Sequence, residues 1–353
     1  MEDMVSRAQT WFGRRVLVTG DTGFKGAWLS AWMDALGAHV TGFALPPHTD
    51  PNLYDALRLE TRIEHRTGDV RDPFAVDAAF AHARAEVVFH FAAQALVRRS
   101  YADPVETFGT NVMGTVHVLD AARRHGVQVV VVVTSDKCYE QGPVVHRFRE
   151  GDSLGGHDPY SASKAAAELV AASYRRSFFA TDGVIATVRA GNVIGGGDWS
   201  PDRIVTDVIA AVRSGSPVRL RYPTAVRPWQ HVVDALDGYL MVAERALAGD
   251  GSVARAWNFA PPGDDTLRVE ALATLLRDEL GSDVPIVVDH ENNPHEAAAL
   301  LLDATDARSL LGWAPRYDAA GAVVATGGWF RSFFDGVPAT ELVDAEIGAR
   351  TNA

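Results

Sequence analysis

The chain has 353 residues, of which 47% are hydrophobic and 22% are charged, and its formal net charge is −12. This composition is typical of a folded globular protein with a large core and argues against an intrinsically disordered chain. The negative charge argues against a protein that binds nucleic acid, because contacts to the phosphate backbone require clustered Lys and Arg.

The sequence contains one cysteine, Cys138, so no disulfide can form within a chain. No group of Cys and His has the spacing of a zinc site, and we expect no bound metal. Residues 1–3 lack the basic start of a signal peptide, and no apolar run reaches the roughly 18–20 residues that span a bilayer. We therefore expect a cytoplasmic protein with no membrane partner.

In the first half of the chain, short Val-rich runs alternate with segments of helical period. The expected strands are apolar throughout, like strands buried on both faces, and cover residues 15–19, 39–43, 87–91, 129–134 and 184–189. The expected helices are 27–36, 73–83, 104–125 and 161–179, with Pro104 at a first helical turn. This alternation predicts an α/β fold with a Rossmann-type doubly wound parallel sheet.

After Asn192 this regular alternation stops. Gly195, Gly196 and Gly197 predict a flexible break, and helical pieces, turns and short strands follow. We expect residues 1–192 plus about 230–260 to form the Rossmann domain. Residues 193–229 plus about 261–336 should form a smaller mixed α/β substrate domain, and 337–353 a loosely tethered tail.

The first expected strand runs into a glycine-rich loop and then a helix. Glycines at intervals of three permit a tight turn and let backbone N–H groups approach a pyrophosphate at the helix N-terminus. The loop predicts a dinucleotide cofactor bound by Gly20, Thr22, Gly23, Phe24, Lys25 and Gly26. No acidic residue closes the second strand to bind the ribose, so this position leaves both NAD and NADP open.

Asp69 follows a further probable strand, within Gly68-Asp69-Val70. Its carboxylate could accept a hydrogen bond from an adenine amino group. It could equally form the turn that precedes Arg71. The local sequence leaves both interpretations open.

Tyr160 and Lys164 stand four residues apart at the start of an expected helix, so their side chains share one face. An ammonium nearby, together with a positive nicotinamide, lowers the pKa of a tyrosine. Such a tyrosine can take the proton of a sugar hydroxyl while hydride leaves. A pair of this kind on a helix is often just solvated, but behind a dinucleotide loop the pattern favours catalysis.

The strand 129–134 continues into Ser135 and Asp136, at the sheet edge where ligands bind in open α/β folds. Ser135 or Thr134 can hydrogen-bond the hydroxyl that is oxidised. Asp136 is placed to act as an acid towards a neighbouring leaving group. The alternative is a solvent-exposed cap at the end of the strand.

These residues resemble the extended short-chain dehydrogenase/reductases and, within them, the CDP-glucose 4,6-dehydratases. The resemblance covers nearly the whole chain, and its most specific parts are Asp136-Lys137, the Gly-Gly-Gly-Asp-Trp run and Arg-Pro-Trp-Gln-His. The motifs that carry it are Thr22 to Gly26, Ala92-Ala93-Gln94, Asn111 to Thr115, Thr134 to Tyr139, Leu154 to Tyr160, Arg189 to Trp199, Arg227 to Val232 and His295-Glu296-Ala297.

The resemblance implies a nucleotide-sugar 4,6-dehydratase with a tightly held NAD. Tyr160 would deprotonate the 4-hydroxyl as hydride leaves C4, a base would take the C5 proton, and hydride would return to C6. Asp136 would protonate the departing 6-hydroxyl. Lys137 stands where dTDP-glucose dehydratases carry Glu, and it is a candidate for the C5 base or an electrostatic steering group.

The resemblance also assigns binding residues. The cofactor contacts that it implies beyond the glycine loop are Asp69, Val70, Ala92, Ala93, Gln94, Asn111, Thr134, Tyr160 and Lys164. Those to the nucleotide sugar are Asn192, Arg203, Arg227 and His231, where Arg suits the diphosphate because its planar fork can bind two phosphate oxygens.

One residue departs from the family pattern. Asp21 stands in the pyrophosphate loop where the family usually has His. A carboxylate there would repel phosphate unless it points away, and one interpretation is that it caps the following helix. The other is a branch with altered cofactor binding or an altered reaction.

Three rival functions stay open. A nucleotide-sugar 4-epimerase shares the fold and the Tyr/Lys pair but needs no acid for a leaving group at C6. A dehydratase for another nucleotide sugar and a non-catalytic sensor are the other two. The resemblance also implies a homodimer, through the helices expected at 104–125 and 161–179.

Overall fold

The computed structural model describes residues 7–142, 146–181, 183–262, 265–289 and 300–351. Its centre is a seven-stranded sheet in the order β12-β7-β5-β4-β1-β2-β3, in which every neighbouring pair is parallel. The strands are β1 (Arg15–Thr19), β2 (His39–Ala44), β3 (Glu64–Thr67), β4 (Val87–His90), β5 (Val129–Val133), β7 (Val184–Ala190) and β12 (Ala256–Phe259). The five expected strands are all present, and β3 and β12 add the edges.

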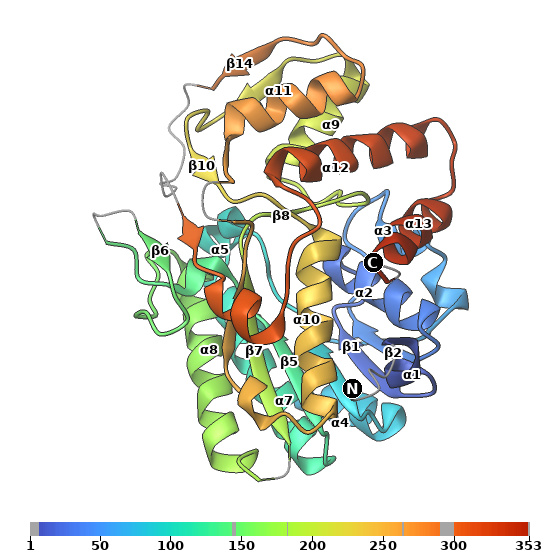
Figure 1. Cartoon of the computed structure of the whole chain (residues 1–353), viewed down its shortest axis with the longest axis vertical. Helices are drawn as coiled ribbons and strands as arrows, with labels where there is room; N and C mark the ends of the chain where they lie inside the picture. The colour runs from blue at the N-terminus through green and yellow to red at the C-terminus, as the bar shows by residue number, and fades with distance from the viewer. Residues whose placement is uncertain (1–6, 143–145, 182, 263–264, 290–299, 352–353) are drawn as a thin grey trace.

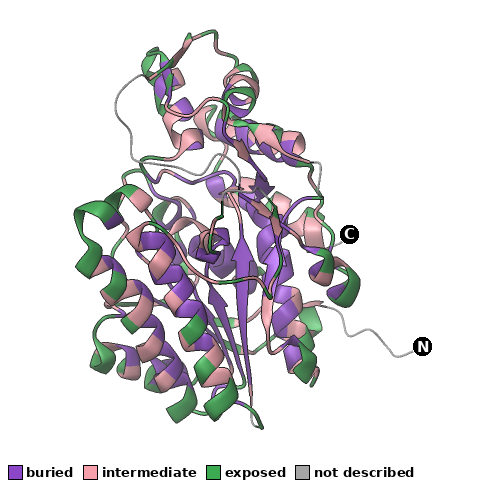
Figure 2. Cartoon of the chain, turned by 90° about the vertical axis from the view of Figure 1, so that its left-hand side faces the viewer, coloured by how far each residue is buried: buried purple, intermediate pink, exposed green. Residues whose placement is uncertain are grey.

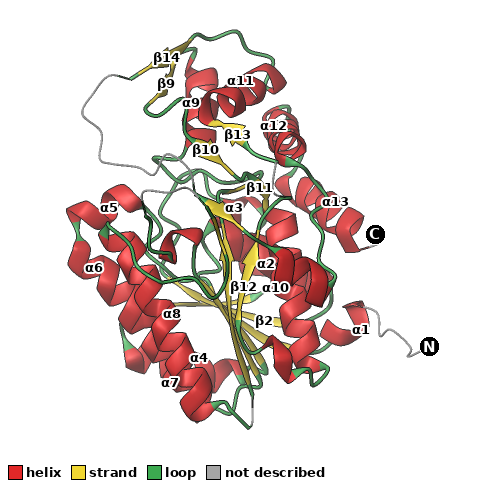
Figure 3. Cartoon of the chain, turned by 60° about the vertical axis from the view of Figure 1, so that its left-hand side comes forward, coloured by secondary structure: helices red, strands yellow, loops and turns green. Residues whose placement is uncertain are grey.

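Helices cover both faces of this sheet (Figure 3). On one face lie α4 (Pro73–Ala83), α7 (Gly114–Arg124) and α8 (Pro159–Phe178). On the other lie α2 (Phe24–Ala35) and α10 (Val232–Leu247). The predicted doubly wound α/β fold is therefore confirmed.

Alternation along the buried strands produces two cores, one on each face of the sheet. In β5, Val130 and Val132 belong to the core beneath α7 and α8, whereas Val129, Val131 and Val133 belong to the core beneath α2 and α10. Successive side chains of a strand point to opposite faces, so a continuous valine run can fill both cores. Figure 2 shows the result as buried strands between helices with exposed outer surfaces.

The helix expected at 104–125 is continuous but not uniform. It starts with α6 (Pro104–Phe108), passes through a π-helical turn at Gly109–Met113 and continues as α7. Such turns are frequent at functional sites. Here the turn contains the buried Asn111, whose contacts are described below.

A second region, drawn at the top of Figure 1, lies beyond the carboxyl ends of the strands. It consists of α9 (Ile204–Ser214), β9 (Val218–Leu220), β10 (Val226–Arg227), β13 (Leu267–Arg268), α11 (Val269–Glu279), β14 (Ile286–Val288) and α12 (Ala319–Phe334). The parallel pair β9/β14 and the antiparallel pair β10/β13 give it the mixed α/β character that the sequence predicted.

Short elements complete the described chain. They are α1 (Arg7–Trp11), α3 (Leu53–Ala56), α5 (Val97–Ala102), the pair β6 (Arg147–Phe148) and β15 (Leu301–Leu302), the pair β8 (Val193–Ile194) and β11 (Gln230–His231), and 3-10 or π turns at Leu59–Thr61, Asp136–Cys138, Gly251–Val253 and Ala307–Leu311. None of the helices in the described ranges combines the length and apolar character needed to cross a membrane. The motif His295-Glu296-Ala297 lies outside the described residues.

The expected flexible break at Gly195, Gly196 and Gly197 is wrong. All three glycines are buried. A Cβ atom on Gly196 would lie 2.0 Å from the indole ring of Trp329, and one on Gly197 2.5 Å from Leu53. The glycines are there because neighbouring side chains pack against the backbone, which holds this segment in place.

The expected loose tail is also wrong for the residues that the structure describes. Ala339–Thr351 forms the helix α13, which buries Ala339, Val343 and Ile347 and contacts α2 and α10. Arg350 also pairs with Asp237 at 2.5 Å. The apolar residues of this segment are spaced for one helix face, and that spacing was the signal for docking.

Candidate active site

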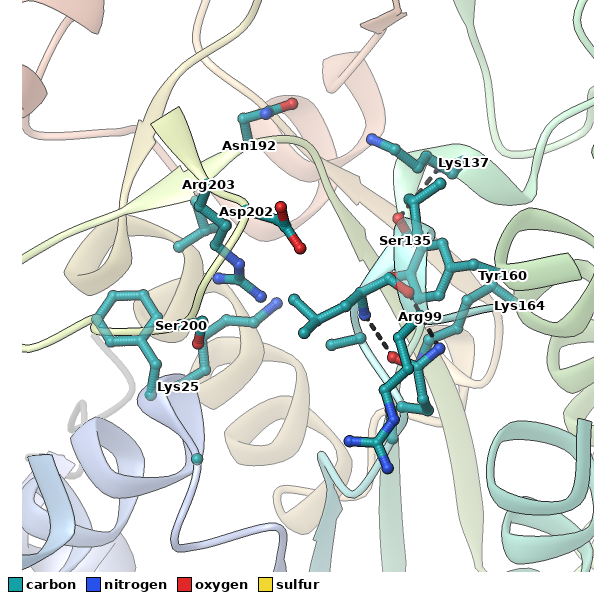
Figure 4. A pocket seen from close by; sticks show the side chains of 18 of the residues that line it. Lys25, Arg99, Ser135, Lys137, Tyr160, Lys164, Asn192, Ser200, Asp202 and Arg203 are labelled. Carbon is teal, nitrogen blue, oxygen red and sulfur yellow. Dashed lines mark hydrogen bonds between the residues drawn. The ribbon is translucent and has the colours of Figure 1, made fainter. Parts of the chain in front are cut away.

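A cavity of about 1240 Å³ lies between the carboxyl ends of the central strands and the second region. A typical small-molecule site occupies about 300–1,000 Å³, so this cavity has room for a cofactor and a substrate together. Figure 4 shows Lys25 and Arg203 on one side and Ser135, Tyr160 and Lys164 on the other. The site therefore combines side chains from both regions of the molecule.

The glycine loop lines this cavity from Gly20 to Gly26, apart from Asp21. Gly20 has φ +79°, and a Cβ atom on Gly26 would lie 2.0 Å from the carbonyl oxygen of Gly20. The helix α2 begins at Phe24, earlier than expected, so its first turn faces the cavity with N–H groups that have no partner within the helix. This cradle fits the pyrophosphate of a dinucleotide.

Asp21 points away from the cavity. It is fully buried, its Oδ2 lies 2.7 Å from Nδ1 of His65, and the absent side chain of Gly42 leaves the space that it fills. The expectation that Asp21 caps α2 is wrong, because Gly23 is the N-cap residue and no side chain caps the helix. The loop can thus carry a carboxylate without presenting it to phosphate.

Tyr160 and Lys164 share the buried face of α8 as predicted. Burial raises the pKa of Tyr160 to about 12, although a hydrogen bond with Ser135 opposes it. Burial lowers the pKa of Lys164 to about 8, against the opposing charge of Glu168. The ammonium alone therefore does not produce the low tyrosine pKa that the pattern suggested, because desolvation of the phenolate is larger.

Ser135 and Asp136 stand beside Tyr160, at the end of β5. The Ser135 hydroxyl donates to Oδ1 of Asp136 at 2.9 Å. Asp136 is 2% exposed, and its Oδ2 has no hydrogen-bond partner among the described residues. A buried carboxylate oxygen without a partner, at a cavity wall, is a group that a substrate hydroxyl would satisfy.

The Thr134 hydroxyl is not free to bind the hydroxyl that is oxidised, which was one of the two options left by the sequence. Its hydroxyl donates to Glu168, although the residue lines the cavity. Of the two hydroxyls considered for the oxidised carbon, Ser135 is the one that lies beside Tyr160. The cavity wall at Thr134 can contact a cofactor through its remaining surface.

Gln94 and Asn111 support the cavity wall more than they offer groups to a ligand. The Gln94 side chain bonds to Leu96 and Thr107, and Asn111 bonds to the Gln94 backbone and to Ser163 at 2.8 Å. Asn111 is 1% exposed and does not line the cavity, so the expectation that it contacts the cofactor is wrong. Its side chain connects the β4 end to α8.

The other expected cofactor residues line the cavity. Ala92 and Ala93 follow β4, and Val70 follows β3. Asp69 also lines it, but its carboxylate accepts hydrogen bonds from the Arg71 backbone and guanidinium. Of the two interpretations of Asp69, the turn-forming one is therefore present.

Asn192, Arg203 and Arg227 all line the cavity. Oδ1 of Asn192 is buried without a hydrogen-bond partner among the described residues, and Arg227 is 6% exposed. Arg203 pairs with Asp198 at 2.7 Å. These side chains present an amide and two guanidinium groups, which suit a diphosphate.

His231 does not take part in this group. It is 2% exposed, lies outside the cavity lining, and its Nδ1 accepts from the backbone of Val233 at the start of α10. Burial lowers its pKa to about 3, so the ring is neutral. The expectation that His231 binds substrate is wrong, because it caps a helix behind the site.

The sequence did not indicate several cationic residues of the cavity: Arg98, Arg99, Arg219 and Arg221. Arg219 and Arg221 alternate along β9 and its end, which was the available signal for a shared face. The positions of the lysines are a clearer indication of which residues line the cavity. The chain has three lysines against 30 arginines, and Lys25, Lys137 and Lys164 all line the cavity.

Within the described ranges, no group of three or more His, Cys, Asp or Glu side chains could hold a metal ion.

Comparisons with known proteins agree with this geometry. Residues 16–258 match the family described as NAD dependent epimerase/dehydratase. The chain is 46% identical over 314 residues to a CDP-glucose 4,6-dehydratase from Salmonella typhimurium, covering 87% of this chain and 88% of the relative. It is 32% identical to a dTDP-glucose 4,6-dehydratase from Streptomyces griseus, covering 93% and 98%.

A solved structure is also similar. The dTDP-glucose 4,6-dehydratase of Streptomyces venezuelae, determined with NAD bound, has a TM-score of 0.75 at 26% identity and covers 90% of this chain and 97% of its own. With the dinucleotide cradle, the Tyr160/Lys164 pair and the family match in place, the chain belongs to the NAD-dependent epimerase/dehydratase family.

Proposed function

We propose that the chain is a nucleotide-sugar 4,6-dehydratase that converts CDP-D-glucose to CDP-4-keto-6-deoxy-D-glucose. The 46% identity to the Salmonella dehydratase supports this substrate. In the structure, the supporting observation is that Tyr160 lies in the same part of the cavity as Asp136, whose Oδ2 has no hydrogen-bond partner among the described residues.

We propose NAD as the cofactor. Its contacts would be the glycine loop and the other expected cofactor residues that line the cavity: Asp69, Val70, Ala92, Ala93, Gln94, Thr134, Tyr160 and Lys164. The cradle at Gly20 and Gly26 and the open first turn of α2 fit its pyrophosphate. When bound, NAD supplies an acceptor for hydride from C4 and a donor of the same hydride to C6, so it ends unchanged.

The residues of the chain move the protons. Tyr160 takes the proton of the 4-hydroxyl, which Ser135 orients by hydrogen bonding. The resulting 4-ketone acidifies the C5 proton, and its removal expels the 6-hydroxyl. Asp136 donates a proton to that oxygen, so water leaves, and a proton returns to C5 as hydride reaches C6.

Lys137 is our candidate for the C5 base or for a charge that steers the substrate. It lies next to Ser135 at the cavity wall (Figure 4). If Lys137 is the base, Lys137→Met should no longer exchange the C5 proton with solvent deuterium. Exchange at the wild-type rate in that variant would exclude Lys137 as the base.

Asn192, Arg203 and Arg227 are proposed to bind the diphosphate of the nucleotide sugar. The second region would then hold the nucleotide, in agreement with the division into a Rossmann domain and a substrate domain. This division, like the cytoplasmic location and the lack of a nucleic-acid partner, stays a prediction.

A homodimer through α6, α7 and α8 also belongs to the proposal. Large apolar side chains are exposed on these helices and on the π-helical turn between α6 and α7: Val105 at 81%, Leu169 at 62%, Met113 at 48% and Phe108 at 40%. Contiguous exposed apolar surface marks interfaces. Light scattering should give the mass of two chains, and replacement of Leu169 by Glu should shift it to one.

The proposed reaction is tested by mass analysis after incubation with CDP-glucose, and with dTDP-, UDP- and GDP-glucose in parallel, in deuterated water. We expect CDP-glucose to lose water and gain one deuterium at C5. Loss of water from another sugar nucleotide would identify that compound as the substrate instead. Interconversion without loss of mass would indicate an epimerase, and no change with any sugar would favour a sensor.

A further inference from the structure

Glu168 is a buried carboxylate next to the catalytic pair that no proposed step uses. It stands one helical turn beyond Lys164 on α8, on the face that also carries Tyr160. Its side chain is 3% exposed. A buried charge is costly unless the surrounding structure holds and satisfies it.

The protein holds Glu168 from two neighbouring strands. Arg189 on β7 donates to both carboxylate oxygens at 2.8 Å, and the hydroxyls of Thr134 and Thr187 donate one hydrogen bond each. Burial raises the pKa of Glu168, but the hydrogen bonds and charge of Arg189 outweigh it and bring the pKa below its ordinary value. Glu168 is therefore ionised at neutral pH.

Arg189 is in turn fixed by groups other than Glu168. Its Nη1 donates to the hydroxyl of Tyr139 at 2.7 Å and to the carbonyl of Glu150 at 3.2 Å. Tyr139 then donates to Oδ1 of Asn258 at 2.7 Å. The carboxylate is thus anchored to a continuous buried network, which fixes where its charge lies.

Apart from Glu168, the ionisable neighbours of Lys164 among the described residues supply no negative charge that would stabilise its ammonium. Its Nζ donates to the carbonyl of Val133 at 3.1 Å. Cys138 faces it from the turn after β5 and His90 from β4, but burial raises the pKa of the thiol and lowers that of the imidazole to about 3, so both are neutral. Lys25 faces it from α2 as a second cation.

The pKa values of Lys164 and Tyr160 set the order in which the two groups lose their protons. Lys164, with a pKa of about 8, loses its proton before Tyr160, with a pKa of about 12, can become a phenolate. A positive nicotinamide would repel the ammonium further. Among the ionisable groups that the described residues place against Lys164, Glu168 is the one that carries negative charge.

We propose that Glu168, held by Arg189, is the counter-charge that keeps Lys164 in its ammonium form during catalysis. Glu168 is therefore a positioning residue, since it acts through Lys164 and does not line the cavity. The inference rests on the roles proposed above for Tyr160 and Lys164. Its main test, a lysine titration, is independent of turnover.

The test is a pH titration of the three lysines by NMR, in NAD-loaded protein labelled with carbon-13 at the lysine side chains. Because the chain has three lysines, Lys164→Met assigns the Lys164 signal directly. In Glu168→Gln we expect the Lys164 midpoint to fall by about one pH unit or more, as for loss of a close opposite charge. Glu168→Asp, which keeps the charge, should return it close to the wild-type value.

Folding is controlled separately, because Glu168→Gln leaves the Arg189 charge buried without its carboxylate partner. The double variant Glu168→Gln/Arg189→Met removes both charges at similar volume, and thermal unfolding reports which variants are folded. The Lys164 shift should appear in the double variant as well. The alkaline limb of the kcat profile should move to lower pH, with KM changed less than about twofold.

An unchanged Lys164 midpoint in a folded variant without the Glu168 charge would overturn the inference. The inference would also be overturned if the Lys164 titration midpoint followed only the loss of thermal stability across the variants and Glu168→Asp did not restore it. Failure of the wild-type protein to act on CDP-glucose would instead refute the proposed function. The lysine titration would still decide the role of Glu168 in that case.

Discussion

The cofactor side and the substrate side of the cavity are built in different ways. On the cofactor side, the proposed pyrophosphate cradle is one contiguous segment, Gly20 to Gly26, in which backbone and a helix N-terminus face the cavity. On the proposed substrate side, arginines from distant segments line the cavity, and three of them pair with a carboxylate: Arg203 with Asp198 at 2.7 Å, and Arg98 and Arg221 with Asp202 at 3.6 and 3.7 Å. A phosphate cradle can therefore be local, whereas the arginine cluster requires the assembled fold.

Tyr160 lies where the two sides meet, so its loss should have the largest effect. In Tyr160→Phe, kcat with CDP-glucose should fall towards the upper end of the about 10²- to 10⁴-fold range for a lost acid–base group. Binding of NAD and substrate should change little, as calorimetry would show. Tyr174→Phe, on the outer part of α8, is the matched control. Retention of a tenth of the activity in Tyr160→Phe would remove Tyr160 from its role.

Asp136 separates the two halves of the reaction. In Asp136→Asn, loss of water should slow by about 10²-fold or more, because the 6-hydroxyl would leave without a proton. Oxidation at C4 should persist, and single-turnover absorbance at 340 nm should show the reduced cofactor accumulating. If both half-reactions slowed equally, Asp136 would act on C4 and not on the leaving group.

Arg227 should affect the substrate side alone. Arg227→Met should raise KM for CDP-glucose about 10- to 100-fold, since a charged hydrogen bond contributes about 1.5–3 kcal/mol. The dissociation constant of NAD should not move. The exposed Arg213→Met on α9 serves as control. Equal weakening of NAD and substrate would contradict the division into two sides.

The smallest expected effect concerns Lys25 and the pH dependence of NAD affinity. Lys25 lies in the glycine loop, but charges elsewhere in the cavity influence its pKa. Burial, with repulsion from Arg203 and Lys164, lowers its pKa to about 7, so the ammonium is present below that pH and lost above it. NAD affinity should therefore fall a few-fold between pH 6.5 and 8.5, because the neutral amine no longer attracts phosphate. Fluorescence titration should show a flatter profile in Lys25→Met. An unchanged slope would mean that Lys25 does not face the pyrophosphate.

The same contrast explains what the sequence could predict. The strands, the glycine loop and the Tyr160/Lys164 pair depend on local spacing, and they are where the sequence placed them. His231 and Asn111 belong to motifs of the same resemblance, yet they support the site from behind it, because a motif does not tell which side of the backbone faces the ligand. Glu168 carried a local signal, four residues after Lys164, but its meaning required Arg189 from another strand.

In the proposed reaction, one bound cofactor moves hydride from C4 to C6 within a single substrate molecule. The direct test uses CDP-glucose labelled with deuterium at C4, mixed with CDP-glucose whose sugar carries carbon-13 and ordinary hydrogen at C4. The product should carry deuterium at C6, with no exchange of label between molecules. Deuterium retained at C4 of an epimerised sugar, or label scrambled between molecules, would contradict it.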